Sequence, residues 1–350
     1  MRIRILGPGA VGVLVGGLLA QEGHEITFVG RRSDHPLGSG RPARLVLPDR
    51  WLPFRPHGYT NAIAVGLESP VDLVIVALRR DHLRELKKTP HGTARVVQTA
   101  GVRAAGTPSP MTPPPILFLN CGDQDTRELV PELYGRDGTA GGFRILHALT
   151  LWAAVRLQPD TVELVSSRPM LVTVKDPSLK AVAAALRAAG VEIVETDRIE
   201  PWHHSFFLWQ MLFLPMAMCH STYEYFMSFA EGREIAAHVI EEGLRTMERS
   251  GAQLRKLPVM DPQELVSRPR KGRRQLTNGR FDPDRGYNSV LQALLRGEKT
   301  EVGELNERLV KRAAEVGVDA SWNWRLARKL SRVVQVGFYR DPAELYQALS

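Results

Sequence analysis

The sequence predicts an α/β domain built on a parallel sheet, followed by an all-α domain. Near the N-terminus, a glycine-rich motif lies between a β-prone run and a helical stretch. Further along, short and nearly continuous apolar runs are typical of strands buried on both faces of a parallel sheet. After Asp197 the apolar residues recur at helical spacing, and no strand-like alternation is evident. We therefore expect one domain over residues 1–197 and a second over residues 198–350.

The N-terminal motif, Gly7-Pro8-Gly9-Ala10-Val11-Gly12, matches the pattern G-x-G-x-x-G. We expect a strand over residues 2–6 before it, a helix over residues 13–21 after it, and a second strand over residues 24–30. The apolar N-terminus also resembles a secretory signal peptide, but a signal peptide needs no second strand in register. The sequence therefore favours a Rossmann-type βαβ unit, which binds a dinucleotide.

Each glycine of this motif has its own function in a dinucleotide-binding turn. Gly7 permits the tight turn, Gly9 lets the backbone approach the pyrophosphate, and Gly12 lets the helix pack closely against the strand. Ala10 and Val11 come just before the predicted helix, at whose N-terminus backbone N–H groups and the positive end of the helix dipole attract phosphates. These five residues are the candidate pyrophosphate-binding residues.

The residues that follow the second strand select the cofactor. A site for NAD usually has Asp or Glu there, which binds the ribose 2′-hydroxyl. This chain has Arg31 and Arg32 instead, and a guanidinium binds a 2′-phosphate through charge-assisted hydrogen bonds. The alternative is that the two arginines only open a surface loop. NADP(H) is the expected cofactor.

Apolar runs and turn residues predict the remaining elements. A buried strand over residues 71–78 leads to Arg79 and another over residues 116–119 leads to Asn120, at strand ends of the kind that bind ligands in such sheets. The other elements expected in the first domain are a hairpin over 44–47 and 51–54, strands over 162–165, 170–174 and 191–194, and helices over 81–88 and 178–189. The second domain is expected to contain helices over 206–218, 231–250, 288–297, 300–316 and 321–336.

Composition limits the compartment and the partners. The chain has 350 residues, with 46 Lys and Arg against 38 Asp and Glu, which gives a net charge of +8. Five of these net charges lie within residues 268–285, and with few aromatic residues nearby we interpret this segment as a solvated loop, with a nucleic-acid-binding site as the alternative. Only two cysteines are present, Cys121 and Cys219, which favours the reducing cytoplasm. No membrane span is expected, because the apolar run 206–218 is too short.

Several motifs resemble the ketopantoate reductase (2-dehydropantoate 2-reductase) family. They include I-L-G-P-G-A-V-G at residues 5–12, G-H-E-I at residues 23–26, and Arg31. Near the C-terminus, S-V-L-Q at residues 289–292 and the run from Thr300 to Asn306 look like the family pattern S-x-L-Q … T-E-[IV] … N. The resemblance implies an NADPH-dependent oxidoreductase with two domains, which transfers hydride to a 2-oxo acid at the cleft between them.

The resemblance also implies roles for individual residues. Arg79 would lie near the adenosine phosphate, and Asn120 would contact cofactor and substrate, although Cys121 follows it where the family has glycine. Ser289 would lie on the substrate side, and Glu301 would be the active-site carboxylate. A carboxylate on a helix surface is the alternative for Glu301.

One departure from the family concerns the proton donor. The family has a lysine in the context W-x-K-[LF], and here the corresponding run, Trp209 to Leu212, places Met211 at that position. A thioether cannot donate a proton, so this chain is a divergent member in which ordinary ketopantoate reduction is in doubt. In a helix that begins near Pro201, His204 would share the face of Met211 and act as an acid. A histidine that only packs at the helix start is the alternative.

The expected function is NADPH-dependent reduction of a small carbonyl or imine substrate. The alternative is an NADP-binding family member without redox activity, which serves as a sensor or partner subunit. No metal site is expected, because neither His203-His204 nor Cys219-His220 has the spacing of metal ligands. The aromatic-rich segment 206–229 suits the interface of a homodimer as well as a core.

Overall fold

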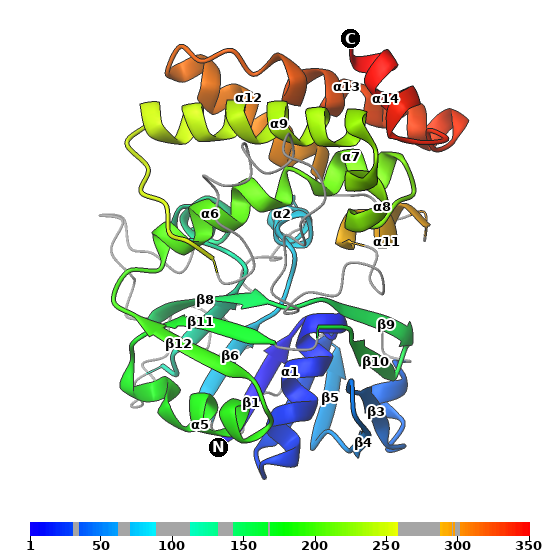
Figure 1. Ribbon diagram of the computed structural model, residues 1–350. Coiled ribbons are helices and arrows are strands. Elements are labelled where there is room, and N and C mark those ends of the chain that lie inside the picture. Colours follow the sequence, from blue (N-terminus) through cyan, green and yellow to red (C-terminus); the bar gives the residue numbers. More distant parts are fainter. Residues whose placement is uncertain are drawn as a thin grey trace. The chain divides into compact units, whose positions relative to one another are not determined.

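The computed structural model describes residues 1–30, 35–61, 71–88, 113–131, 143–166, 169–257, 288–295, 297 and 302–350. The chain divides into two compact units, Met1–Ile199 and Glu200–Ser350. The first unit is α/β and the second is helical in its described part, which confirms the predicted fold class (Figure 1). Within the described residues, no helix is both long and apolar enough to cross a membrane. The basic segment 268–285 lies outside the described residues.

The described part of the first unit contains an eight-stranded sheet in the order β12-β11-β8-β7-β6-β1-β2-β5. Neighbouring strands are parallel except for β8 and β11, which are antiparallel. The predicted parallel sheet is therefore right for all but this one pair. The strands are β1 (Arg2–Leu6), β2 (Glu25–Gly30), β5 (Gly58–Asn61), β6 (Leu73–Val76), β7 (Ile116–Leu119), β8 (Ile145–Leu151), β11 (Met170–Val174) and β12 (Glu192–Thr196).

The central strands are buried on both faces, as their continuous apolar sequences predict. On β6, Leu73 and Ile75 join one hydrophobic cluster, whereas Val74 and Val76 join another on the opposite face. The helices of this unit are α1 (Ala10–Gln21), α2 (Arg80–Lys88), α4 (Asp123–Leu129) and α5 (Lys180–Ala188). Helices α1 and α5 pack against each other, and α2 packs against α4.

A second, four-stranded sheet is built in the order β4-β3-β10-β9 from the described residues. Its strands are β3 (Ala43–Val46), β4 (Trp51–Phe54), β9 (Ala154–Gln158) and β10 (Thr161–Leu164). The predicted hairpin is confirmed as the antiparallel pair of β3 and β4. Strand β10 pairs in parallel with β3 and antiparallel with β9, and both β9 and β10 contact α1.

The second unit consists of helices in its described part. They are α6 (Glu200–Gln210), α7 (Phe213–Met218), α8 (Tyr223–Ser228), α9 (Ala230–Arg249), α11 (Ser289–Leu295), α12 (Val302–Glu315), α13 (Ser321–Val336) and α14 (Pro342–Leu349). Helix α9 is the longest of these and packs against α6, α8, α12, α13 and α14.

The prediction of a single helix over residues 206–218 is wrong. Helix α6 ends at Gln210, the N–H of Met211 bonds to the carbonyl of Leu208 in a tight turn, and α7 begins at Phe213. Pro215 explains the break, because proline has no N–H for an intrahelical bond and is tolerated in the first turn of a helix. The break places Pro215 in the first turn of α7.

A buried carboxylate joins three helices of this unit. Glu242 on α9 accepts hydrogen bonds from the backbone N–H of Trp322 (2.8 Å) and of Asn323 (3.0 Å) at the start of α13. It also accepts one from the side-chain amide of Asn323 at 2.8 Å. The amide of Asn306 on α12 donates to Asn323 Oδ1 at 2.7 Å. Asn306, the last residue of the family-like C-terminal pattern, therefore has a structural function in this network.

Candidate functional site

Three predicted site residues lie just after the ends of strands of the large sheet. Gly7 comes after β1, Arg79 comes shortly after β6, and Asn120 comes after β7. These strands are parallel neighbours, so their carboxyl ends lie along one edge of the sheet. In open α/β sheets, ligands bind at this edge where the strand order reverses. Here that point lies at β1, between β2 and β6.

Packing and backbone conformation within the chain explain why two of the three positions in the turn are glycine. Gly7 has a φ of +101°, and its N–H donates to the carbonyl of Val29 at 3.0 Å. A Cβ on Gly12 would lie 2.2 Å from the carbonyl oxygen of Gly7, which no side chain tolerates. Any other residue at Gly7 or Gly12 would therefore strain the turn or separate α1 from it.

At Gly9, neither the backbone conformation nor packing within the chain requires glycine. Its φ is −78° and its ψ is −177°, an extended conformation that any residue adopts, and a Cβ here would meet nothing within 4 Å. The fold alone therefore leaves open space beside the backbone at Gly9. This space is what a dinucleotide-binding turn needs for the close approach of a pyrophosphate.

The start of α1 suits an anion for two further reasons. Its N-cap is Gly9, with no side-chain cap, and its first turn contains no acidic residue. The N–H groups of Ala10, Val11 and Gly12 belong to the first turn of the helix, where no intrahelical acceptor exists. These N–H groups and the helix dipole attract negative charge. The residues present therefore fit the phosphates of a dinucleotide.

The end of β2 is closely packed. A Cβ on Gly30 would lie 2.2 Å from the hydroxyl oxygen of Tyr59 on β5 and 3.0 Å from Cγ of Pro8. The ring of His35 stacks on that of Tyr59, with 5.1 Å between centroids. Arg31 and Arg32 lie outside the described residues, so their proposed contact with a 2′-phosphate stays a prediction.

Arg79 has a carboxylate and an imidazole as neighbours. Its guanidinium forms an ion pair with Asp81 at 3.0 Å and lies 3.3 Å from Nε2 of His82. The Asp81 carboxylate also accepts a hydrogen bond from the N–H of His82. Arg79 is thereby held at the sheet edge, and its contact with an adenosine phosphate stays a prediction.

Asn120 is held in a conformation that few residues adopt. Its φ is +59°, and its backbone N–H donates to the carbonyl of Ala148 at 2.8 Å. Its side chain is bound by Thr150 on β8: Oδ1 accepts the N–H of Thr150 at 2.8 Å, and Nδ2 donates to Oγ1 at 2.7 Å. Asparagine tolerates the left-handed region better than most residues. Thr150 therefore fixes the position of Asn120, although the sequence alone did not identify it as a site residue.

In the second unit, Ser289 is the exposed first residue of α11. The preceding residue, Asn288, caps this helix by accepting the N–H groups of Val290 and Leu291, and donates to the carbonyl of Phe213 at 3.2 Å. Asn288 was not singled out from the sequence, although its place before a helical run is a capping signal. Glu301 lies outside the described residues, so its role as the active-site carboxylate stays a prediction.

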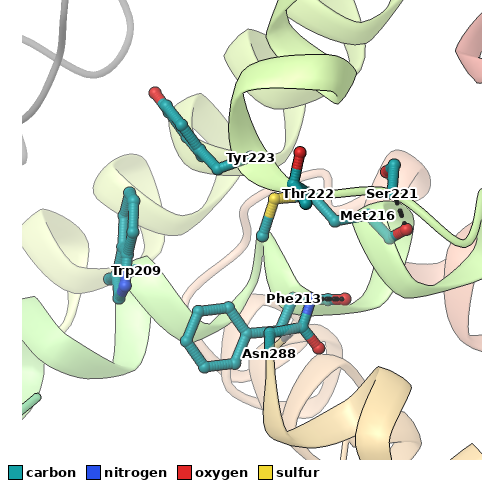
Figure 2. Close-up of a pocket in the computed structure, with 7 residues that line it drawn as sticks. All are labelled: Trp209, Phe213, Met216, Ser221, Thr222, Tyr223 and Asn288. Carbon is teal, nitrogen blue, oxygen red and sulfur yellow. Dashed lines mark hydrogen bonds between the residues drawn. The ribbon is translucent and has the colours of Figure 1, made fainter. Parts of the chain in front are cut away.

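A small aromatic pocket lies beside this helix start, with the rings of Trp209 and Tyr223 at one side (Figure 2). Their ring centroids are 5.4 Å apart. The residues that line the pocket are Trp209, Phe213, Met216, Ser221, Thr222, Tyr223 and Asn288. Trp209 is the tryptophan of the family-like W-x-K-[LF] position. The pocket therefore joins that run to the start of α11.

Met211, in contrast, does not line this pocket, and its side chain is fully buried, with 0% exposed. The expectation that His204 shares a helical face with Met211 requires a helix that continues through Met211, whereas α6 ends at Gln210. Nδ1 of His204 lies 3.0 Å from the carbonyl oxygen of Gln253. A carbonyl oxygen only accepts hydrogen bonds, so the N–H at Nδ1 is the donor in this one. The acid role of His204 stays a prediction.

Comparison with known proteins places the chain in a family. Residues 3–89 match the model of the family described as ketopantoate reductase PanE/ApbA, and residues 198–334 match the model of its C-terminal part. The chain is 25% identical to a 2-dehydropantoate 2-reductase from Pyrococcus horikoshii over 337 residues, or 93% of this chain and 95% of the relative.

Solved structures share the fold. A PanE/ApbA family ketopantoate reductase from Ralstonia eutropha has a TM-score of 0.73 and 20% identity, and covers 96% of this chain and 98% of its own. A D-mandelate dehydrogenase, solved with NADH and anilino(oxo)acetate, has a TM-score of 0.71 and 16% identity over 100% of this chain and 99% of its own. The two family models together span well over half of the chain. The chain therefore belongs to the ketopantoate reductase family.

Proposed function

We propose that the chain is an NADPH-dependent reductase that transfers hydride to the carbonyl or imine carbon of a small 2-oxo acid or a related compound. The observation that carries this proposal is Gly9, a glycine beside open space at the uncapped N-terminus of α1. Two comparisons support it: the Pyrococcus relative is named a 2-dehydropantoate 2-reductase, and the D-mandelate dehydrogenase was solved with NADH.

The residues of the first unit would bind and orient the cofactor. The turn from Gly7 to Gly12 would hold the pyrophosphate through backbone N–H groups. Arg31 and Arg32 would bind the 2′-phosphate, and Arg79 would lie near the adenosine phosphate. The nicotinamide ring supplies the hydride, while the protein supplies position and electrostatics.

On the reacting side, Asn120 would contact cofactor and substrate, fixed in place by Thr150. Ser289 and Glu301 would bind the substrate. The proton for the developing alkoxide does not come from Met211, whose thioether has none to give; we assign it to His204 or to water. A positioned general acid contributes typically about 10²–10⁴-fold to the rate. We therefore expect slow turnover of ketopantoate itself.

The cofactor assignment is tested by the dissociation constants of NADPH and NADH for wild type and Arg31→Ala. Wild type is expected to bind NADPH more tightly than NADH. Arg31→Ala is expected to weaken NADPH binding by about 10- to 100-fold, the loss of a hydrogen-bonded charge pair, and to leave NADH binding unchanged. Arg50→Ala, which removes an exposed arginine paired with Asp49, serves as the matched control. NADPH binding that is no tighter than NADH binding, or is insensitive to Arg31→Ala, removes the assignment to NADP.

Turnover separates this function from the alternative of an NADP-binding protein without redox activity. The measurement is NADPH consumption with a panel of 2-oxo acids. Consumption with any of them supports the reductase. Tight NADPH binding without consumption supports a sensor or partner subunit, which the buried methionine in place of the family lysine favours.

A further inference from the structure

We propose that Arg156 binds the pyrophosphate of the dinucleotide, an inference that rests on the proposed function. Arg156 lies on β9 of the smaller sheet, and its guanidinium donates a hydrogen bond to the carbonyl oxygen of Pro8. Pro8 stands between Gly7 and Gly9 in the phosphate-binding turn. The smaller sheet thus adds a cation to a turn that is 148 residues away in the sequence.

The fold explains how Arg156 reaches the turn. Strand β9 pairs with β10, where Arg156 lies opposite Val162, and both strands contact α1. Figure 1 shows β9 and β10 close to this helix, in agreement with these contacts. The helix begins directly after the glycine turn. A side chain that extends from β9 to Pro8 therefore lies at the N-terminal end of α1, where the phosphates would bind.

The chemistry of the turn gives this guanidinium a function. Pro8 has no N–H, so this position of the turn offers a phosphate no backbone donor. Arg156 supplies N–H donors and a positive charge at that position. A guanidinium is planar and presents several donors in fixed directions, which lets it bind a carbonyl oxygen and a phosphate oxygen together. The bond to Pro8 fixes its orientation before the ligand arrives.

This assignment differs in its consequences from that of Arg31. The 2′-phosphate is present in NADPH alone, whereas the pyrophosphate is common to NADPH and NADH. Loss of Arg156 therefore weakens both dinucleotides by the same factor, and it also weakens ADP. Adenosine, which has no phosphate, is unaffected. A side chain that only braced the turn would also affect ADP more than adenosine, so direct contact with the phosphate is tested separately, by protection of Arg156 from chemical modification.

The test measures dissociation constants of NADPH, NADH, ADP and adenosine for wild type, Arg156→Gln and Arg156→Lys by calorimetry. Arg156→Gln is expected to weaken the two dinucleotides and ADP by about 10- to 100-fold each, with adenosine unchanged. Arg156→Lys keeps the charge and is expected to lose less. Arg187→Gln, which removes an exposed arginine on α5 that is paired with Glu195 on β12, is the control and should change nothing.

A second measurement uses wild type alone, so the proposal stays testable where a variant does not fold. An arginine-specific dicarbonyl reagent is applied with and without ADP, and the modified residues are mapped by mass spectrometry. Protection of Arg156 by ADP and not by adenosine is expected. Unchanged affinities in folded Arg156→Gln, or modification of Arg156 that ADP does not affect, overturns the proposal. Wild type that binds neither dinucleotide contradicts the proposed function itself.

Discussion

Replacement of Met211 by lysine is expected to lower the free energy of unfolding by about 3–6 kcal/mol, because it buries an ammonium group in an apolar place. The Met211 side chain is fully buried in the turn between α6 and α7. Lysine is the residue that the resemblance to the family predicts at this position, yet the charge would have no water around it. Denaturant unfolding at neutral pH measures the loss.

Met211→Leu is the matched control, since a volume-conserving apolar exchange usually costs less than about 1.5 kcal/mol. Met211→Lys that is as stable as wild type would mean that the side chain at this position reaches water or a binding site. In that case methionine would be present because the reaction differs, and not because the position is buried in the core. A gain in 2-oxo acid turnover by Met211→Lys would point the same way.

Replacement of Glu242 by alanine is expected to lower the free energy of unfolding by about 3–5 kcal/mol, because it leaves buried donors without an acceptor. The carboxylate binds the N–H groups of Trp322 and Asn323 and thereby caps α13 from α9. Glu242→Gln keeps one oxygen and is expected to lose less. Glu241→Ala is the control: Glu241 forms a surface ion pair with Arg245 and should change stability by less than about 1 kcal/mol.

The pH dependence of stability gives a second measurement of the same site. Burial raises the pKa of Glu242, against the opposing effect of its hydrogen bonds from Trp322 and Asn323. The folded protein therefore holds this proton more tightly than the unfolded chain does. The stability from this group is complete below the ordinary carboxyl pKa and declines as the pH rises through the folded-state pKa. Glu242→Gln should flatten this decline, and an unchanged slope would contradict it.

The parts of the fold and of the site that could be predicted from the sequence are those that short runs of adjacent residues specify. The turn from Gly7 to Gly12 and the strands that end before Arg79 and Asn120 are read from adjacent residues, and the structure places all three along one sheet edge. The smaller sheet was predicted only as the hairpin of β3 and β4. Strands β5, β8 and β9 and helices α4 and α14 were missed.

The missed elements carry residues whose functions come from long-range contacts. Thr150 on β8 binds Asn120 from 30 residues away, and Arg156 on β9 reaches Pro8. No short pattern marks either pairing, because the partners meet only when the sheets form. The break between α6 and α7 was predictable in principle from Pro215, since proline cannot continue the intrahelical hydrogen bonds.

Gly9→Ala tests most directly whether the glycine turn binds a dinucleotide. A Cβ at Gly9 meets nothing within 4 Å, so the variant should fold with a stability within about 1 kcal/mol of wild type, the usual range for an N-cap change. Gly58→Ala is the matched control, because Gly58 begins β5 at the opposite edge of the sheet and its Cβ would make only ordinary contacts.

The decisive measurement is the dissociation constant of NADPH for wild type, Gly9→Ala and Gly58→Ala, with thermal unfolding of each. The expected result is a loss of at least about tenfold in affinity for Gly9→Ala alone, since the added methyl group occupies the space of the pyrophosphate. Folded Gly9→Ala that binds NADPH as tightly as wild type would contradict a phosphate site at this turn.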